Sequence, residues 1–259
     1  PMTASDTGEN TEKAAAALWD YLDVSRFGEK TVLSADIKPE FDFAVKSVCL
    51  IEAKTGTVLY ENDSDVRYMP ASVTKVMTLL LVFEAIDGGK IKLTDEITAS
   101  SHAAEMGGTQ IYLKPGETMT VEELIKAVAI PSANDAAVAL AEYVAGSEDE
   151  FVRQMNEKAK TLGLENTNFT NCTGLFDDEN HYTTAYDIAI MSRELIKHEK
   201  IFDFTTVWLD SLRDGAFTLA NTNKMLRTYN GMKGLKTGFT KASKYCFSGV
   251  AERNGMTLI

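Results

Sequence analysis

The chain has 259 residues and carries 26 Lys and Arg against 38 Asp and Glu, which gives a formal net charge of −12. With 44% hydrophobic and 25% charged residues, its composition is that of a folded globular protein, and it excludes a disordered tail, a collagen-like repeat and a membrane bundle. The excess of negative charge repels phosphate backbones and anionic headgroups, so we expect no nucleic-acid partner.

The first predicted elements are a short helix and a β-hairpin. Residues 12–23 are Ala-rich and carry the apolar side chains Leu18, Trp19 and Leu22, a pattern that predicts a short helix. Residues 45–52 and 57–61 are β-prone, and Lys54-Thr55-Gly56 between them is typical of a hairpin turn. These two segments are therefore expected to pair as antiparallel strands.

Helical periodicity dominates the middle of the chain, from about residue 72 to residue 200. The run 76–86 is almost wholly apolar and stops at Gly88-Gly89, which predicts a buried helix with a glycine cap. Four more helices are expected: one after a capping box formed by Thr120 and Glu123, one over 135–145 before Gly146, one marked by Phe151, Met155 and Ala159 before Gly163, and one that Thr184 opens.

β-Prone residues return at 234–240, 245–252 and 256–259, with Arg253-Asn254-Gly255 as a hairpin turn. Strands at both chain ends thus enclose a helical middle. This order predicts an α+β fold in which one antiparallel sheet is built from both ends of the chain and an all-helical lobe is inserted between them, with a cleft where the two meet.

The cysteines and histidines do not form a metal-binding pattern. The three cysteines stand far apart with no C-x-x-C, and no two of the three histidines are spaced at i,i+4. We therefore expect three unpaired thiols, no metal and no cofactor.

Ser72 and Lys75 form the first pattern that carries chemistry. They lie three residues apart at the start of the buried helix, so they share one helical face and the amine can reach the hydroxyl. A serine nucleophile needs an adjacent base, and a lysine can serve when burial and a nearby cation lower its pKa. The helix N-terminus adds backbone N–H groups where an oxyanion would develop. A capping Ser beside a surface Lys is the alternative, but Lys75 leads into an apolar helix, where an unpartnered cation is unfavourable.

Two further short motifs follow along the chain. Ser132-Ala133-Asn134 lies on the link between two apolar helices, where taken alone it is most simply interpreted as an N-cap. Lys236-Thr237-Gly238 lies in a strand-like stretch, where Gly lets a ligand backbone approach closely. The earlier Lys54-Thr55-Gly56 is interpreted as the hairpin turn. Each motif is unspecific by itself, whereas the three in this order are specific.

Together the three motifs resemble those of the low-molecular-weight penicillin-binding proteins, the serine D-alanyl-D-alanine carboxypeptidases. The resemblance covers residues 45–259 and includes the segments 58–60, 70–78, 113–116, 132–136, 173–175, 181–185 and 221–224. It implies the penicillin-binding fold, with 42–259 as the catalytic domain, a helical lobe at about 72–200, and 1–41 as an N-terminal extension. It also leads us to expect, beyond Ile259, a further strand, a closing helix and often a β-rich domain and an amphipathic membrane anchor.

The resemblance implies a catalytic role for four residues. Ser72 would be acylated by the penultimate D-Ala carbonyl, with Lys75 as its general base. Ser132 would help pass a proton to the departing D-Ala, and Asn134 would hold the substrate amide and the lysine.

The resemblance also implies the groups that bind the substrate. Lys236 and Thr237, in the triplet that Gly238 completes, would bind the terminal carboxylate. The backbone N–H groups of Ser72 and Phe239 would form the oxyanion hole. Phe239 departs from the family pattern, in which this position often carries His or Tyr, so substrate contacts are expected to differ there.

The expected function is therefore removal of the terminal D-Ala from peptidoglycan stem peptides, outside the cytoplasmic membrane, with β-lactam antibiotics as covalent inhibitors. A β-lactamase is one alternative, but no E-x-x-x-N pattern between Ser132 and Lys236 supplies the Glu that would place a deacylating water. A non-catalytic muropeptide or β-lactam receptor is another, and it has no need of a nucleophile with its base. Outside the motifs, His181 is expected to order the loop before its helix and Arg227 to lie at the surface.

Overall fold

A computed structural model describes residues 44–259 of the chain. The helix expected at 12–23 and the proposed extension 1–41 lie outside these residues. Nine strands are described, and they are β1 Val48–Ile51, β2 Val58–Asn62, β3 Glu96–Thr98, β4 Thr118–Thr120, β5 Leu209–Leu212, β6 Phe217–Ala220, β7 Met232–Thr240, β8 Lys244–Arg253 and β9 Met256–Leu258.

The helices of the described part lie between β2 and β7. The α-helices are α2 Lys75–Asp87, α3 Ser101–Ala104, α4 Val121–Ala129, α5 Asn134–Ala145, α6 Glu148–Thr161, α7 Ala185–Leu195 and α8 Phe202–Thr205. Three short 3₁₀ turns accompany them, η2 Ala71–Thr74, η3 Glu199–Ile201 and η4 Lys224–Arg227.

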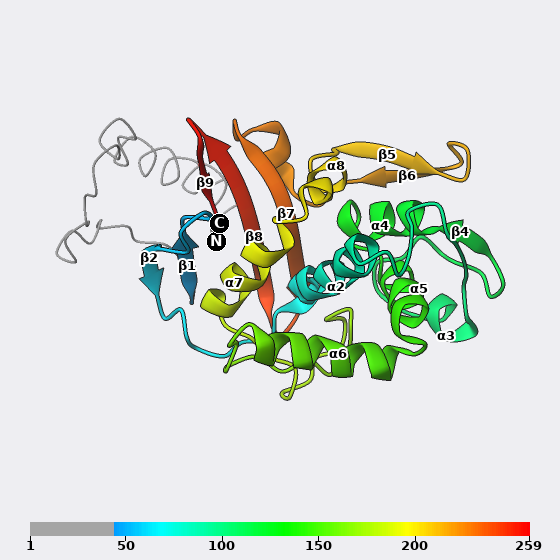
Figure 1. Cartoon of the computed structure of the whole chain (residues 1–259), viewed down its shortest axis with the longest axis horizontal. Coiled ribbons are helices and arrows are strands. Elements are labelled where there is room, and N and C mark those ends of the chain that lie inside the picture. The colour runs from blue at the N-terminus through cyan, green and yellow to red at the C-terminus, as the bar shows by residue number, and fades with distance from the viewer. Residues whose placement is uncertain (1–43) are drawn as a thin grey trace.

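Both ends of the described chain contribute to one antiparallel sheet, as expected. The hairpin β1–β2 and the meander β7–β8–β9 are each antiparallel. The two parts join where Ile51 N–H donates to the Ile259 carbonyl at 2.9 Å and Ile259 N–H donates back to the Ile51 carbonyl at 3.0 Å. The blue β1 and the red β9 accordingly lie side by side in Figure 1. The fold class predicted from the sequence is thus confirmed.

The two predicted hairpin turns have the backbone that their glycines allow. Gly56, between β1 and β2, has φ +75°, and Asn254 and Gly255, between β8 and β9, have φ +50° and +75°. Two successive positive φ values define the type I′ turn that matches the twist of an antiparallel pair. The first Lys-Thr-Gly triplet is therefore a turn and not part of the site.

Helix α2 is the centre of the inserted lobe. Every residue from Lys75 to Phe83 is buried, and the helix packs against α5 and α7. The capping box predicted for α4 is present, because the Thr120 side chain accepts from Glu123 N–H while the Glu123 carboxylate accepts from Thr120 N–H. Gly146 follows α5 with φ +89°, as a left-handed helix end requires.

The lobe departs from the expected all-helical make-up. It contains the short antiparallel pair β3–β4, and the hairpin β5–β6 follows it before β7. Strands of three or four residues are too short to show a period-two pattern, so their pairing depends on tertiary contacts that the sequence does not display. Among residues 44–259, no helix is long and apolar enough to cross a membrane.

Candidate active site

Ser72 lies in the 3₁₀ turn η2, directly before the central helix α2. The turn packs against β7, so the start of the helix faces the sheet. Ala71, just before the serine, has the left-handed φ of +49°, which is uncommon for a residue with a side chain. Ser72 is half-buried, whereas Lys75, one helical turn later, is completely buried. The surface-lysine alternative for this motif is therefore wrong.

The amine of Lys75 makes three polar contacts. Its Nζ lies 3.0 Å from Ser72 Oγ, 2.6 Å from Asn134 Oδ1 and 2.8 Å from the Thr173 carbonyl oxygen. The last two oxygens can only accept. A neutral amine would donate its two hydrogens to them, which leaves its lone pair directed at the Ser72 hydroxyl.

Burial favours that neutral form of Lys75. It lowers the pKa of the amine from 10.5 to about 7, against a smaller opposing influence of Cys172 and Asp135. A base with a pKa near the working pH combines a useful neutral fraction with adequate basicity.

The Ser132-Ala133-Asn134 segment turns sharply into α5. Ser132 has φ +75°, and its buried Oγ has no hydrogen-bond partner within residues 44–259. The N-cap of α5 is Ala133, without a side-chain cap, so the simple N-cap interpretation of this motif is wrong. Asn134 is instead fixed by its Nδ2, which donates to the Gly107 carbonyl at 2.8 Å while its Oδ1 faces Lys75.

Lys236 projects from β7 into the buried space near Lys75. It is 1% exposed, and its Nζ donates to the Thr237 carbonyl at 3.1 Å. Burial, and to a smaller extent the nearby charge of Lys75, lowers the pKa of Lys236 well below its ordinary value. No carboxylate within residues 44–259 pairs with this amine, so an anion bound here would stabilise its charged form.

Gly238 allows β7 to approach the serine closely. A Cβ at this position would lie 2.9 Å from the Ser72 backbone nitrogen and 3.1 Å from the Pro70 carbonyl oxygen. The glycine of the triplet is thus required by the contact between the strand and the turn, in line with the expectation of a close backbone approach.

Two residues that the sequence singled out lie at the rim or surface. Phe239 is 55% exposed, and its ring lies 4.7 Å from that of Tyr245 on β8. Its side chain therefore lies on the outer rim. Arg227 is exposed, with its guanidinium over the Trp208 ring, as expected for a surface position.

Sequence reasoning missed two groups of the site. The Thr173 carbonyl contacts Lys75, and the Thr222 hydroxyl accepts a hydrogen bond from Thr237 Oγ1 at 2.6 Å. A backbone acceptor leaves no signal in residue type, and Thr222 lies 15 residues from Thr237 in the sequence. Both segments had been noted only through the resemblance.

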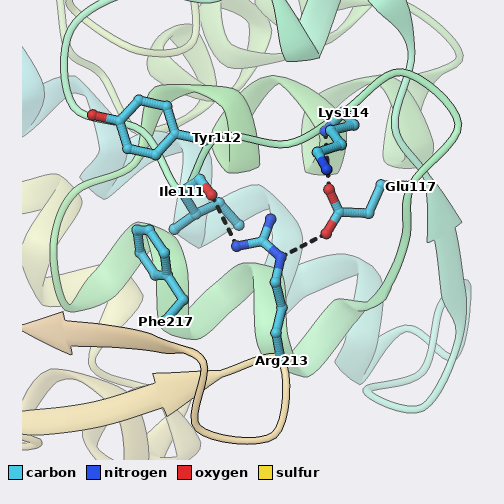
Figure 2. A pocket seen from close by; sticks show the side chains of 6 residues that line it. All are labelled: Ile111, Tyr112, Lys114, Glu117, Arg213 and Phe217. Atoms are coloured by element: carbon cyan, nitrogen blue, oxygen red, sulfur yellow. Dashed lines mark hydrogen bonds and ion pairs between the residues drawn. The ribbon is translucent and has the colours of Figure 1, made fainter.

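A separate surface pocket lies at the junction of the lobe and the β5–β6 hairpin (Figure 2). Arg213, from the hairpin, spans it and donates to Glu117 at 2.7 Å and to the Ile111 carbonyl at 2.9 Å. The exposed ring of Tyr112 and the half-buried ring of Phe217 meet edge to face at its side. None of the residues that line it belongs to the three motifs.

Comparison with known proteins places this arrangement in a family. The family model for D-alanyl-D-alanine carboxypeptidase, peptidase family S11, matches residues 33–259. The chain belongs to this family.

Relatives are found both among curated proteins and among solved structures. The chain is 52% identical over 223 residues to D-alanyl-D-alanine carboxypeptidase DacF of Bacillus subtilis, covering 85% of this chain and 57% of that protein. It is 37% identical over 217 residues to DacC of Escherichia coli, covering 81% of this chain and 54% of that protein. It thus spans little more than half the length of these relatives.

The fold is shared with solved penicillin-binding proteins. Penicillin-binding protein D2 of Listeria monocytogenes, in its ampicillin-bound form, superposes with a TM-score of 0.77 and 31% identity, covering 85% of this chain and 89% of that one. The family and fold implied by the sequence resemblance are confirmed.

Proposed function

We propose that this chain carries the catalytic domain of a serine D-alanyl-D-alanine carboxypeptidase, which removes the terminal D-Ala from peptidoglycan stem peptides. The observation that carries the proposal is the placement of the buried Lys75 amine against Ser72 Oγ and two acceptor-only oxygens. Membership of the family supports the same activity. Residues 42–259 form the catalytic domain in this proposal, with the lobe at about 72–200 inserted in it.

Acylation begins with proton transfer from Ser72 to the neutral Lys75. Ser72 Oγ forms a bond to the carbonyl carbon of the penultimate D-Ala, and the carbonyl electron pair moves to its oxygen. The backbone N–H groups of Ser72 and Phe239 stabilise that oxyanion. The carbonyl then re-forms as the C–N bond breaks, and the leaving amine takes up a proton that Ser132 relays from Lys75. The buried Ser132 hydroxyl has no hydrogen-bond partner among residues 44–259, so it is free for this role.

Deacylation uses water in place of the departed D-Ala. The neutral Lys75 accepts a proton from the water as its oxygen attacks the ester carbonyl, and Ser72 Oγ regains a proton as the ester bond breaks. Asn134 holds both Lys75 and the substrate amide in this scheme, and the position of its Oδ1 at 2.6 Å from Nζ supports the first part of that role.

The substrate is selected by its terminal carboxylate. Lys236 supplies a buried cation and Thr237 a hydroxyl next to it, and this pair suits a carboxylate better than a neutral end group. Gly238 brings both within reach of Ser72. A β-lactam, which presents a carboxylate beside a strained amide, would occupy the same groups and acylate Ser72.

The place of action follows from the substrate. Peptidoglycan stem peptides lie outside the cytoplasmic membrane, so we place the enzyme there, at the cell wall. Attachment to the membrane through a C-terminal segment stays a prediction of the resemblance.

Release of D-Ala from a diacylated L-Lys-D-Ala-D-Ala peptide tests the proposal. The parent chain should release D-Ala, and the same peptide ending in L-Ala should be spared. Ser72→Ala should abolish release while its circular dichroism spectrum and melting temperature stay close to those of the parent. Release by Ser72→Ala at the parent rate, or no release by a folded parent that also fails to react with penicillin, would refute the assignment.

A further inference from the structure

A buried chain of hydrogen bonds leads from His181 to the backbone just before Ser72. His181 Nε2 lies 2.7 Å from Thr74 Oγ1, and Thr74 Oγ1 donates to the Ala71 carbonyl at 2.8 Å. His181, Thr74 and Ala71 are each at most 2% exposed. The mechanism above uses none of these three side chains, so this series of hydrogen bonds needs a separate explanation.

The donors around the imidazole fix its tautomer. Thr170 N–H donates to His181 Nδ1 at 3.0 Å, so this nitrogen is an acceptor. The Asn171 amide nitrogen also approaches Nδ1, at 3.4 Å. In the neutral ring the proton is then on Nε2, which donates to Thr74 Oγ1 and leaves the threonine proton free for the Ala71 carbonyl. Each hydrogen bond in the series from His181 through Thr74 to Ala71 therefore has one donor and one acceptor.

The Ala71 carbonyl and the Ser72 N–H belong to the same planar peptide unit. Because the C=O and N–H bonds lie in one plane and point in opposite directions, fixing the direction of the carbonyl oxygen also fixes the direction of the N–H. That N–H is one of the two donors of the proposed oxyanion hole. Thr74 thus controls the aim of a catalytic hydrogen bond without touching the substrate.

This peptide unit needs such a constraint. Ala71 has φ +49°, a conformation that a residue with a side chain seldom adopts unless its surroundings impose it. Gly174 packs against its oxygen side, where a Cβ would lie 1.8 Å from the Ala71 oxygen, and Gly238 packs against its nitrogen side. The two glycines confine the plane by contact, and the Thr74 hydrogen bond sets its rotation.

We propose that His181 is a positioning residue for the oxyanion hole, acting through Thr74 and the Ala71 carbonyl to aim the Ser72 N–H at the developing oxyanion. This inference rests on the proposed function, since it assigns His181 a part in the same acyl transfer. It predicts an effect on the rate of acylation and not on the affinity for the ligand that precedes it.

Substitutions at Thr74 separate the hydrogen bond from the packing. Thr74→Val keeps the shape and removes the hydroxyl, so the acylation rate constant with benzylpenicillin should fall about 10-fold or more, with the preceding dissociation constant little changed. Thr74→Ser restores a hydroxyl and should recover most of that loss. Both constants come from stopped-flow measurements over a range of penicillin concentrations.

Two matched substitutions at His181 test the hydrogen bond from the imidazole to Thr74. The amide of glutamine can occupy the place of Nε2, so His181→Gln should keep the contact to Thr74. The amide of asparagine can occupy only the place of Nδ1, so His181→Asn should lose it. We expect acylation by His181→Asn to be slowed as in Thr74→Val, and the double variant to be no slower than either single one, because the two residues act in one chain.

The outcomes distinguish this inference from the proposed function. If the folded Thr74→Val is acylated at the parent rate, or if His181→Gln and His181→Asn are slowed equally, the positioning role is refuted while the parent still reacts. If Thr74→Val does not fold, the His181 pair decides by the same criterion. A parent that is not acylated at all would refute the proposed function and the positioning role with it.

Discussion

At the scale of single residues, the proposed mechanism makes the nucleophilicity of Ser72 depend on the protonation state of Lys75. Burial lowers the pKa of this amine to about 7. Acylation by benzylpenicillin should therefore slow about tenfold per pH unit below that value, because only the neutral amine accepts the serine proton. The second-order rate constant between pH 5 and pH 9 gives the profile, and a flat acid limb would contradict a neutral Lys75 base.

The same shift has a consequence for stability. In the folded state the pKa of Lys75 lies below its ordinary value of 10.5, so between about pH 7 and 10.5 the unfolded chain binds more protons than the folded one. The contribution of Lys75 to stability accordingly rises with pH across this window, and below it the buried amine is charged and unfavourable.

In the proposed mechanism, binding of the substrate carboxylate at Lys236 is coupled to proton uptake by its amine. Burial and the charge of Lys75 lower its pKa, and a bound carboxylate would raise the pKa again by stabilising the charged form. The KM for a peptide with a free terminal carboxylate should therefore increase as the pH rises and the amine loses its proton. A peptide amidated at its C-terminus serves as the control, since it should bind weakly at every pH. Parallel KM profiles for the two peptides would exclude Lys236 as the carboxylate site.

His181 makes stability depend on pH at the acid side. Burial lowers its pKa from 6.5 to about 4, against a smaller opposing influence of Asp178, the charged group that faces it. Between these two values the unfolded chain binds more protons, so the contribution of His181 falls as the pH drops from 6.5 to 4, with a slope of at most about 1.4 kcal/mol per pH unit. Urea unfolding of the parent should show this slope and His181→Gln should lack it. Equal slopes in the two proteins would show that the imidazole is protonated in the folded state.

At the scale of elements, the first residues of α5 hold the loop 109–113, which lies before β4 and α4 in the sequence. The Asp135 carboxylate is fully buried and accepts from the backbone N–H groups of Ile111 and Leu113, with distances of 3.0 to 3.2 Å. The neighbouring Asn134 N–H donates to the Thr109 carbonyl at 2.7 Å. The start of α5 and the loop 109–113 therefore form one unit, and that unit carries the Asn134 side chain to Lys75.

Removal of the carboxylate should loosen this unit. Asp135→Ala leaves two buried N–H donors without an acceptor, so we expect a loss of about 2–4 kcal/mol in the free energy of unfolding, together with slower acylation. Asp135→Asn keeps one acceptor oxygen and should lose less. Urea denaturation of the three proteins measures the difference, and an unchanged midpoint for Asp135→Ala would show that the loop does not depend on this contact.

At the scale of the whole molecule, the arrangement of sheet and lobe was predictable because the patterns that encode it are long. Helix α2 has 13 residues and the β-prone strands β7 and β8 have 9 and 10, so each is long enough to leave a pattern in the sequence. The pairs β3–β4 and β5–β6 were missed because each strand has only three or four residues. The join between Ile51 and Ile259 could be expected only from the overall pattern, since its register is fixed by tertiary packing.

The site likewise has parts that the sequence could predict and parts that it could not. The contact between Lys75 and Ser72 could be predicted from their three-residue spacing, whereas Lys236 was expected at the site only through the resemblance, because its triplet is unspecific by itself. Two contacts could not be predicted: that of the Thr173 carbonyl with Lys75, and the link that Thr74 makes between His181 and Ala71. Such contacts arise only when segments distant in the sequence fold together. His181 was expected to order its loop, and in the structure it is also connected to the turn that carries Ser72.

Mapping of the penicillin adduct tests the central claim, that Ser72 is the acylated nucleophile. The protein is incubated with benzylpenicillin, followed by intact mass over hours and then digested, with Ser72→Ala as the control. We expect one adduct that persists for hours, on the peptide that contains Ser72, and none on the variant. An adduct on another residue, the absence of any adduct, or rapid hydrolysis of the drug without a lasting adduct would contradict the account, and the last of these would indicate a β-lactamase.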